Sequence, residues 1–178
     1  NDSVAFVTNH DVWGNESGLG YRYGDGGQWR DRQANREHFR DELLAHFVIL
    51  ARSEGIPYVY SEYDDGPSQD FRDPGFNYVR FHERPEIGAL LEFHTETLGS
   101  WQRWRWVDDE RLGLSRGDFG FVAINKSAET QTVTLPTQTL QTPATYHNLL
   151  NNEEITLSNN SFTLTIPPRT AQLWITKQ

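Results

Sequence analysis

The alternation of apolar and polar positions predicts a strand, a helix and a second strand in the first part of the chain. The stretch "AFVTNHDV" begins with a short apolar run, Ala5–Val7, which is typical of a buried strand, and then turns polar at once. A helix is predicted where apolar residues recur every three or four positions and Gly55 supplies a stop. The residues of this apolar face are Phe39, Leu43, Phe47, Leu50 and Ala51. The segment "IPYVYS", Ile56–Ser61, predicts the second strand.

A second helix is predicted from Pro85, a residue favoured in the first turn of a helix, to Gly99, which closes it. Its expected apolar face consists of Ile87, Leu90, Leu91, His94 and Leu98. Because His94 lies on this face, we interpret it as a buried histidine with a hydrogen-bond partner rather than as a ligand.

After Gly99 the pattern changes to short alternating runs that are rich in threonine. Examples are "GFVAINKS", "QTVTLP", "EEITLS", "FTLTIP" and "TAQLWITK", with Asn, Pro and Ser turns between them. Such runs predict an antiparallel β domain with one buried face on each strand. We therefore divide the chain into an α/β part, residues 1–99, and an all-β part, residues 100–178.

Each of the two predicted strands in the α/β part is followed by a polar loop. The first loop, Trp13–Trp29, contains six glycines and is longer than most loops in compact domains, which favours a functional role. The order of elements is the βα repeat of a parallel α/β fold, in which ligands bind at the carboxyl ends of the strands. Two parallel strands cannot cover their own faces and edges. We therefore expect this part to need further strands.

Composition excludes several classes of function. The chain has 25 acidic and 16 basic residues, and a net charge of -9 repels both nucleic acid and anionic membranes. No apolar run is long enough to span a bilayer. The absence of Cys excludes disulfides, thiolate metal sites and thiol nucleophiles. The absence of Met and of a leader-like start predicts a mature, processed or excised form.

Three stretches in the expected order resemble the alpha-amylase family of glycoside hydrolases. "FVTNHD" is similar to the seventh barrel strand of that family, "GIPYVYS" to the eighth, and "RGDFGFVAINKS", Arg116–Ser127, to the start of the following β domain. The likeness is nearest to secreted bacterial alpha-amylases. It implies the C-terminal fragment of a (β/α)8 TIM barrel, residues 1–99, followed by an antiparallel Greek-key β sandwich, residues 100–178.

The resemblance also implies roles for the residues after the first strand. Asp11 would be the carboxylate that stabilises the positively charged transition state of a retaining glycosidase, and His10 would donate a hydrogen bond to the same sugar. Asn9 would orient these neighbours, and Trp13 could stack on a glucose unit. The residues alone leave open a polar strand end in which Asp11 caps a turn.

The family's other requirements would lie before residue 1. These are the nucleophile, the general acid and a structural calcium site, so the resemblance implies that this chain alone is inactive and holds no cofactor. A chloride ion is not expected, because Tyr58 stands where chloride-binding members have a basic residue, and a phenol cannot offset a buried anion. The expected partners are starch or malto-oligosaccharides and the N-terminal part of the barrel, and the expected location is extracellular.

Several other interpretations stay open at this level. Another alpha-glucan-active member of the family, a glucosidase or a transglycosylase, would share the Asn-His-Asp motif. A non-catalytic carbohydrate-binding or structural module would depend on residues 100–178 alone. The acidic loop after the second strand, with Glu62, Asp64 and Asp65, is interpreted as solvated surface. The tryptophans and arginines of "SWQRWRWVDD" are expected to pack between the barrel and the β domain, with arginine stacked on indole.

Overall fold

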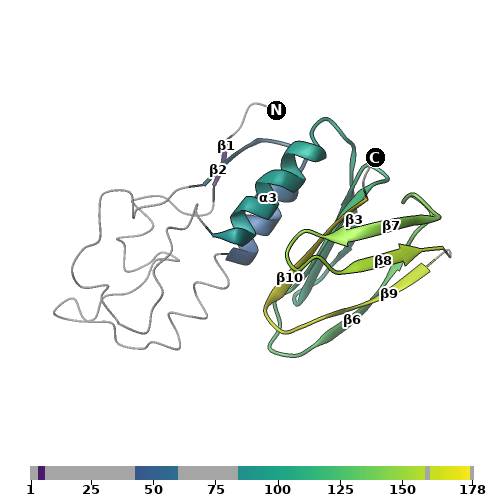
Figure 1. Cartoon of the computed structure of the whole chain (residues 1–178). Helices are drawn as coiled ribbons and strands as arrows, with labels where there is room; N and C mark the ends of the chain where they lie inside the picture. The colour runs from purple at the N-terminus through teal and green to yellow at the C-terminus, as the bar shows by residue number, and fades with distance from the viewer. Residues whose placement is uncertain (1–3, 7–42, 60–83, 159–160, 177–178) are drawn as a thin grey trace.

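The computed structural model describes residues 4–6, 43–59, 84–158 and 161–176 (Figure 1). In the first part of the chain, β1 (Val4–Phe6) pairs in parallel with β2 (Ile56–Tyr58). Val4 lies opposite Ile56, and Phe6 lies opposite Tyr58. Two strands that are distant in the sequence therefore run side by side in the same direction, as the βα pattern predicts.

Two helices follow the predicted positions. Residues 43–51 are helical, and α3 extends over Pro85–Glu96 with Pro85 in its first turn. The predicted apolar face of α3 is only partly correct. Ile87, Leu90 and Phe93 are fully buried, whereas Leu91 and Leu98 are 46% and 73% exposed. Leu98 follows the C-cap residue Thr97 and lies beyond the end of α3, so it does not share the buried face of the helix.

The rest of the described chain is a β domain with two sheets. The larger sheet has the order β3-β4-β5-β10-β7-β8, and β6 pairs with β9 in the smaller one. The bounds are β3 Gln102–Val107, β4 Arg111–Arg116, β5 Gly120–Asn125, β6 Gln131–Pro136, β7 Ala144–Asn148, β8 Glu154–Leu157, β9 Ser161–Ile166 and β10 Thr170–Thr176. All pairings within these two sheets are antiparallel. The return of β10 to lie between β5 and β7 is a Greek-key type of crossing, so the predicted antiparallel sandwich is confirmed.

The larger sheet is the middle layer of three, because both of its faces are buried. Val122 and Ile124 of β5 join Leu173 of β10 in a cluster with the two helices, which we call the helix-side core. The alternate residues Phe121 and Ala123 join a second cluster with β6 and β9, which we call the inter-sheet core. This alternation explains why all six residues of β5 are buried. In Figure 1, α3 and the helical segment 43–51 stand between the β1–β2 pair and the β domain.

The helix-side core crosses the predicted domain boundary. It contains Phe47 and Phe93 from the helices as well as Leu114 and Val122 from the sheet. The change from helix to strand does occur near residue 99. The division into residues 1–99 and 100–178 as separate domains stays a prediction, since one apolar cluster joins the two parts.

Candidate functional site

The parallel pairing of β1 and β2 defines where the candidate site begins. The carboxyl ends of the two strands, Phe6 and Tyr58, are partners in register, so the chain leaves both strands at the same edge. Asn9, His10, Asp11 and Trp13 follow Phe6 by three to seven residues in the sequence. These four residues lie outside the described part of the chain, and so do Glu62, Asp64 and Asp65. Their roles therefore stay predictions.

Tyr58 is the residue on which the prediction about chloride rests. Its side chain is 52% exposed at the end of β2. Val4 and Ile56, which are partners at the start of the two strands, are 56% and 59% exposed. This pair of short strands thus presents apolar surface that the described residues leave uncovered.

His94 has the structural role that its position on the apolar face predicts. The Nδ1 atom lies 2.8 Å from the carbonyl oxygen of Leu50, so Nδ1 carries the proton and donates it. The contact joins the last turn of α3 to the end of the helical segment 43–51. The predicted hydrogen bond of His94 is confirmed, but the residue is half-buried and not fully buried as predicted.

The aromatic stretch before β4 differs from the prediction. Trp101 and Trp104 are 48% and 42% exposed, and Trp106 packs against the inter-sheet core rather than between the helices and the sheet. Arg105 donates from Nε to the Ser115 hydroxyl over 2.8 Å and from Nη2 to the Thr139 hydroxyl. Trp106 differs from the prediction because of a β-bulge between Trp104 and Trp106. The bulge turns the indole of Trp106 to the face of the sheet opposite to that of Trp104.

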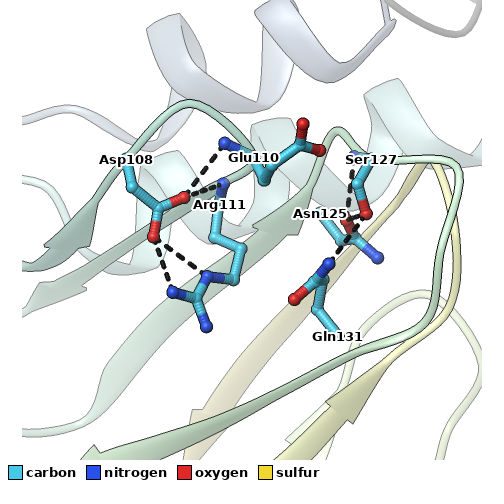
Figure 2. A network of polar contacts seen from close by, with 6 residues as sticks. All are labelled: Asp108, Glu110, Arg111, Asn125, Ser127 and Gln131. Atoms are coloured by element: carbon cyan, nitrogen blue, oxygen red, sulfur yellow. Dashed lines mark hydrogen bonds and ion pairs between the residues drawn. The ribbon is translucent and has the colours of Figure 1, made fainter.

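Two polar networks hold turns of the β domain (Figure 2). In the turn after β3, the Asp108 carboxylate accepts hydrogen bonds from the Arg111 side chain at 3.0 and 2.8 Å and from two backbone amides. The hydrogen bonds from the Arg111 guanidinium are the main reason why the pKa of Asp108 lies below its usual value. This carboxylate stays ionised and is hydrogen-bonded within its own turn. It therefore stabilises the turn and is not placed to transfer protons.

The second network is centred on Asn125 at the end of β5. Its Oδ1 atom accepts from the Ser127 amide and hydroxyl at 2.9 and 2.7 Å. Its Nδ2 atom donates to the carbonyl oxygens of Glu129, Ile166 and Pro167. Gln131 completes the network with a 3.1 Å bond to the Ser127 hydroxyl. Sequence reasoning assigned no role to Asn125, although its place after four buried apolar residues was a signal for a polar anchor.

One cavity of about 420 Å³ lies where the helices meet the turns of the β domain. Its apolar lining includes Leu43, Leu149 and Leu150, and its charged lining includes Arg84 and Glu86, which form an ion pair of 3.5 Å. A retaining glycosidase needs two carboxyl groups at its reacting bond. Among the described residues that line the cavity, Glu86 is the single carboxylate, so these residues do not supply such a pair.

We also looked for metal-binding groups and membrane-spanning helices among the described residues. Among them, no three His, Asp or Glu side chains are grouped so that they could hold a metal ion. No helix within the described ranges is long and apolar enough to cross a membrane.

Comparison with known proteins links this architecture to one family. Residues 115–174, which extend from β4 into β10, match the family model of the alpha-amylase C-terminal domain. A beta/alpha-amylase of Paenibacillus polymyxa is 26% identical over 97% of this chain and 18% of its own length. An alpha-amylase of Aeromonas hydrophila is 29% identical over 71% of this chain and 23% of its own length. The chain thus spans about a fifth of these relatives.

A solved structure extends the likeness to the fold. Alpha-amylase I from Eisenia fetida, determined as an E249Q variant in complex with maltohexaose, superposes with a TM-score of 0.65. The match covers 96% of this chain and 40% of that protein at 18% sequence identity. Residues 115–174 therefore match an alpha-amylase C-terminal domain, and the fold of the chain resembles the C-terminal portion of alpha-amylase family glycoside hydrolases.

Proposed function

We propose that this chain is the C-terminal portion of a retaining alpha-amylase, which hydrolyses internal alpha-1,4-glucosidic bonds of starch and related glucans. The observation that carries the proposal is the parallel β1–β2 pair, with Asn-His-Asp directly after β1 in the sequence and an alpha-amylase C-terminal domain after α3. The maltohexaose bound by the Eisenia fetida enzyme supports a malto-oligosaccharide as substrate.

Asp11 is proposed as the carboxylate that stabilises the transition state. The sugar ring becomes cationic as its bond breaks, and a fixed negative charge beside it lowers the barrier. His10 donates a hydrogen bond to that sugar, Asn9 orients the two side chains, and Trp13 offers an aromatic face for a neighbouring glucose unit. All four follow the carboxyl end of β1, which is the end at which parallel α/β folds place ligands.

The remaining parts of the catalytic centre are proposed to come from an N-terminal part of the same barrel. The half-exposed Val4, Ile56 and Tyr58 support this, because a two-stranded parallel sheet leaves such residues and its edges uncovered. The nucleophile, the general acid and a structural calcium site belong to that part, so these 178 residues alone are inactive. Chloride dependence is not expected, and the intact enzyme is proposed to act outside the cell.

The test is the Asp11→Asn substitution in the protein joined to its upstream coding sequence. We expect turnover on soluble starch to fall by about 10²–10³ while the melting temperature stays unchanged, because only the charge is lost. Asp109→Asn, an exposed acid in the turn between β3 and β4, is the matched control and should keep full activity. Near-normal turnover of Asp11→Asn would contradict the role of Asp11.

Product analysis of the parent enzyme distinguishes the reaction from others of the family. Internal cleavage releases a range of malto-oligosaccharides early in the reaction. Release of glucose alone would identify a glucosidase, and the appearance of longer or branched glucans would identify a transglycosylase. A joined protein that binds starch without cleaving it would reject the enzymatic proposal in favour of a carbohydrate-binding module.

A further inference from the structure

Arg116 is a charged residue that is buried at the junction of the helices and the β domain. It is the last residue of β4, and its side chain is 1% exposed. Leu114, two positions earlier on the same strand, belongs to the helix-side core. Because side chains two apart on a strand point to the same face, the guanidinium of Arg116 lies on the helix side of the sheet.

The guanidinium contacts the ends of both helices. Its Nη1 atom donates to the carbonyl oxygen of Ala51 and its Nη2 atom to that of Thr97, each over 2.8 Å. Ala51 is the last residue of the helical segment 43–51, and Thr97 is the C-cap of α3. Carbonyl groups at these positions lack partners within their own helix and lie at the negative end of its dipole. One cation thus contacts the ends of both helices, and the Thr97 carbonyl also accepts from the Ser100 amide and hydroxyl at 3.0 and 2.7 Å.

No ion pair offsets this charge within the described part of the chain. The two hydrogen bonds go to neutral carbonyls, and the Nε atom is buried without a partner. Burial lowers the pKa of Arg116, but an arginine stays protonated in a protein. Burial of a charge is weak evidence for a gain in stability, because apolar side chains of similar volume often replace buried charges without loss. The benefit of this cation is therefore sought in what it orients.

Gly120 of β5 allows the end of α3 to come close to the sheet beside Arg116. Gly120 is the register partner of Arg116 on β5. A Cβ atom added at Gly120 would lie 3.0 Å from the Phe93 ring and 3.2 Å from the Thr97 methyl group. The last turn of α3 therefore rests directly on the backbone of β5, beside the guanidinium.

We infer that Arg116 is the residue that couples the β domain to the two helices, through the fork of its Nη groups. It fixes the C-terminal ends of both helices to the same point of the sheet. Because β2 begins at Ile56, five residues after Ala51, the guanidinium also sets where this strand starts relative to the β domain. This inference concerns structure and does not depend on the reaction that the intact protein catalyses.

Hydrogen exchange of the 178-residue chain tests the inference. In Arg116→Met, which keeps an unbranched apolar stem but removes the guanidinium, peptides over residues 45–52 and 90–98 should exchange at least about tenfold faster. Peptides over β6 and β9, on the far side of the sandwich, should keep the protection of the parent chain. Arg111→Met, on the exposed end of the same strand, is the matched control and should leave all four peptides unchanged.

Two results would overturn the inference. One is unchanged exchange at both helix ends in Arg116→Met. The other is an equal loss of protection in β6 and β9, which would make Arg116 a general core residue. If Arg116→Met does not fold, Arg116→Lys decides, since it keeps the charge but not the fork. Faster exchange at the helix ends of Arg116→Lys would support the inference, and unchanged exchange would overturn it.

Discussion

At the scale of single residues, the bulge in β3 depends on the absence of one side chain. Gly113 lies opposite Trp106, and a Cβ atom added there would lie 2.4 Å from the indole ring. The ring cannot move inward, because Trp106 packs against the inter-sheet core. A residue without a Cβ atom is thus required at position 113, because the indole of Trp106 lies so close to the backbone there. Two non-bonded carbon atoms do not come within 3 Å of each other.

We predict that Gly113→Ala lowers the free energy of unfolding by about 1–3 kcal/mol, because the indole must leave its position. Urea denaturation followed by tryptophan fluorescence measures this change. Gly88→Ala is the control, because a Cβ atom at this helical glycine meets nothing within 4 Å. That substitution should raise the stability by about 0.5–1 kcal/mol. A neutral Gly113→Ala would show that the bulge tolerates a side chain.

Tyr146 makes the stability depend on alkaline pH. The side chain is fully buried, its hydroxyl donates to the Asp118 carbonyl over 2.7 Å, and burial raises its pKa to about 12. In the unfolded chain the phenol ionises near pH 10. The stabilisation is therefore complete below about pH 10 and is lost as the pH rises towards 12, by about 3 kcal/mol in total.

The comparison of the parent chain with Tyr146→Phe isolates this effect. Near neutral pH the substitution should lower the free energy of unfolding by about 1 kcal/mol, because the hydrogen bonds of the hydroxyl are lost. Between about pH 10 and 12 the parent chain should lose stability more steeply than the variant. Parallel pH profiles of the two proteins, measured by urea denaturation, would contradict the raised pKa.

At the scale of elements, Asn125 joins the two sheets of the sandwich. It stands at the end of β5 and donates to the carbonyl oxygens of Ile166 and Pro167 at the end of β9. We predict that Asn125→Asp destabilises the chain by about 3 kcal/mol, because a carboxylate would face three carbonyl oxygens without protons to donate. Thermal unfolding followed by circular dichroism measures it. Gln131→Glu, at the exposed rim of the same network, should cost less than half as much.

The sequence was sufficient to predict most elements, and it failed where tertiary contacts decide. The helices and five of the β-domain strands follow from their spacing of apolar residues, because each buries one defined face. The exposed Leu91 and Leu98 could not be foreseen, since Phe93 and Thr97 take the place against Gly120. The place of Trp106 depends on a bulge that leaves no periodic signal. Arg116 gave no signal either, because its partners are backbone carbonyls 65 and 19 residues away.

At the scale of the whole molecule, the larger sheet depends on the helices to cover one of its two faces. Its helix-side face carries Leu114, Val122, Ile124 and Leu173, which are all fully or almost fully buried against the helices. Without residues 1–99, these side chains and the guanidinium of Arg116 would meet water. Figure 1 shows the helices lying against this face of the β domain. The region that matches the alpha-amylase C-terminal domain is therefore packed as part of a larger core.

We accordingly predict that a truncated chain of residues 100–178 is less stable than the 178-residue chain by several kcal/mol, because four apolar side chains lose their cover. Urea denaturation followed by far-ultraviolet circular dichroism measures the difference, since the β domain is present in both chains. A chain of residues 43–178, which regains the helical segment and α3, should recover most of the loss. If the truncated chain unfolds at the same urea concentration as the full chain, the β domain is an independent module. That outcome would also favour a carbohydrate-binding role for residues 100–178, whereas the expected loss would show that the β domain needs the cover of the two helices.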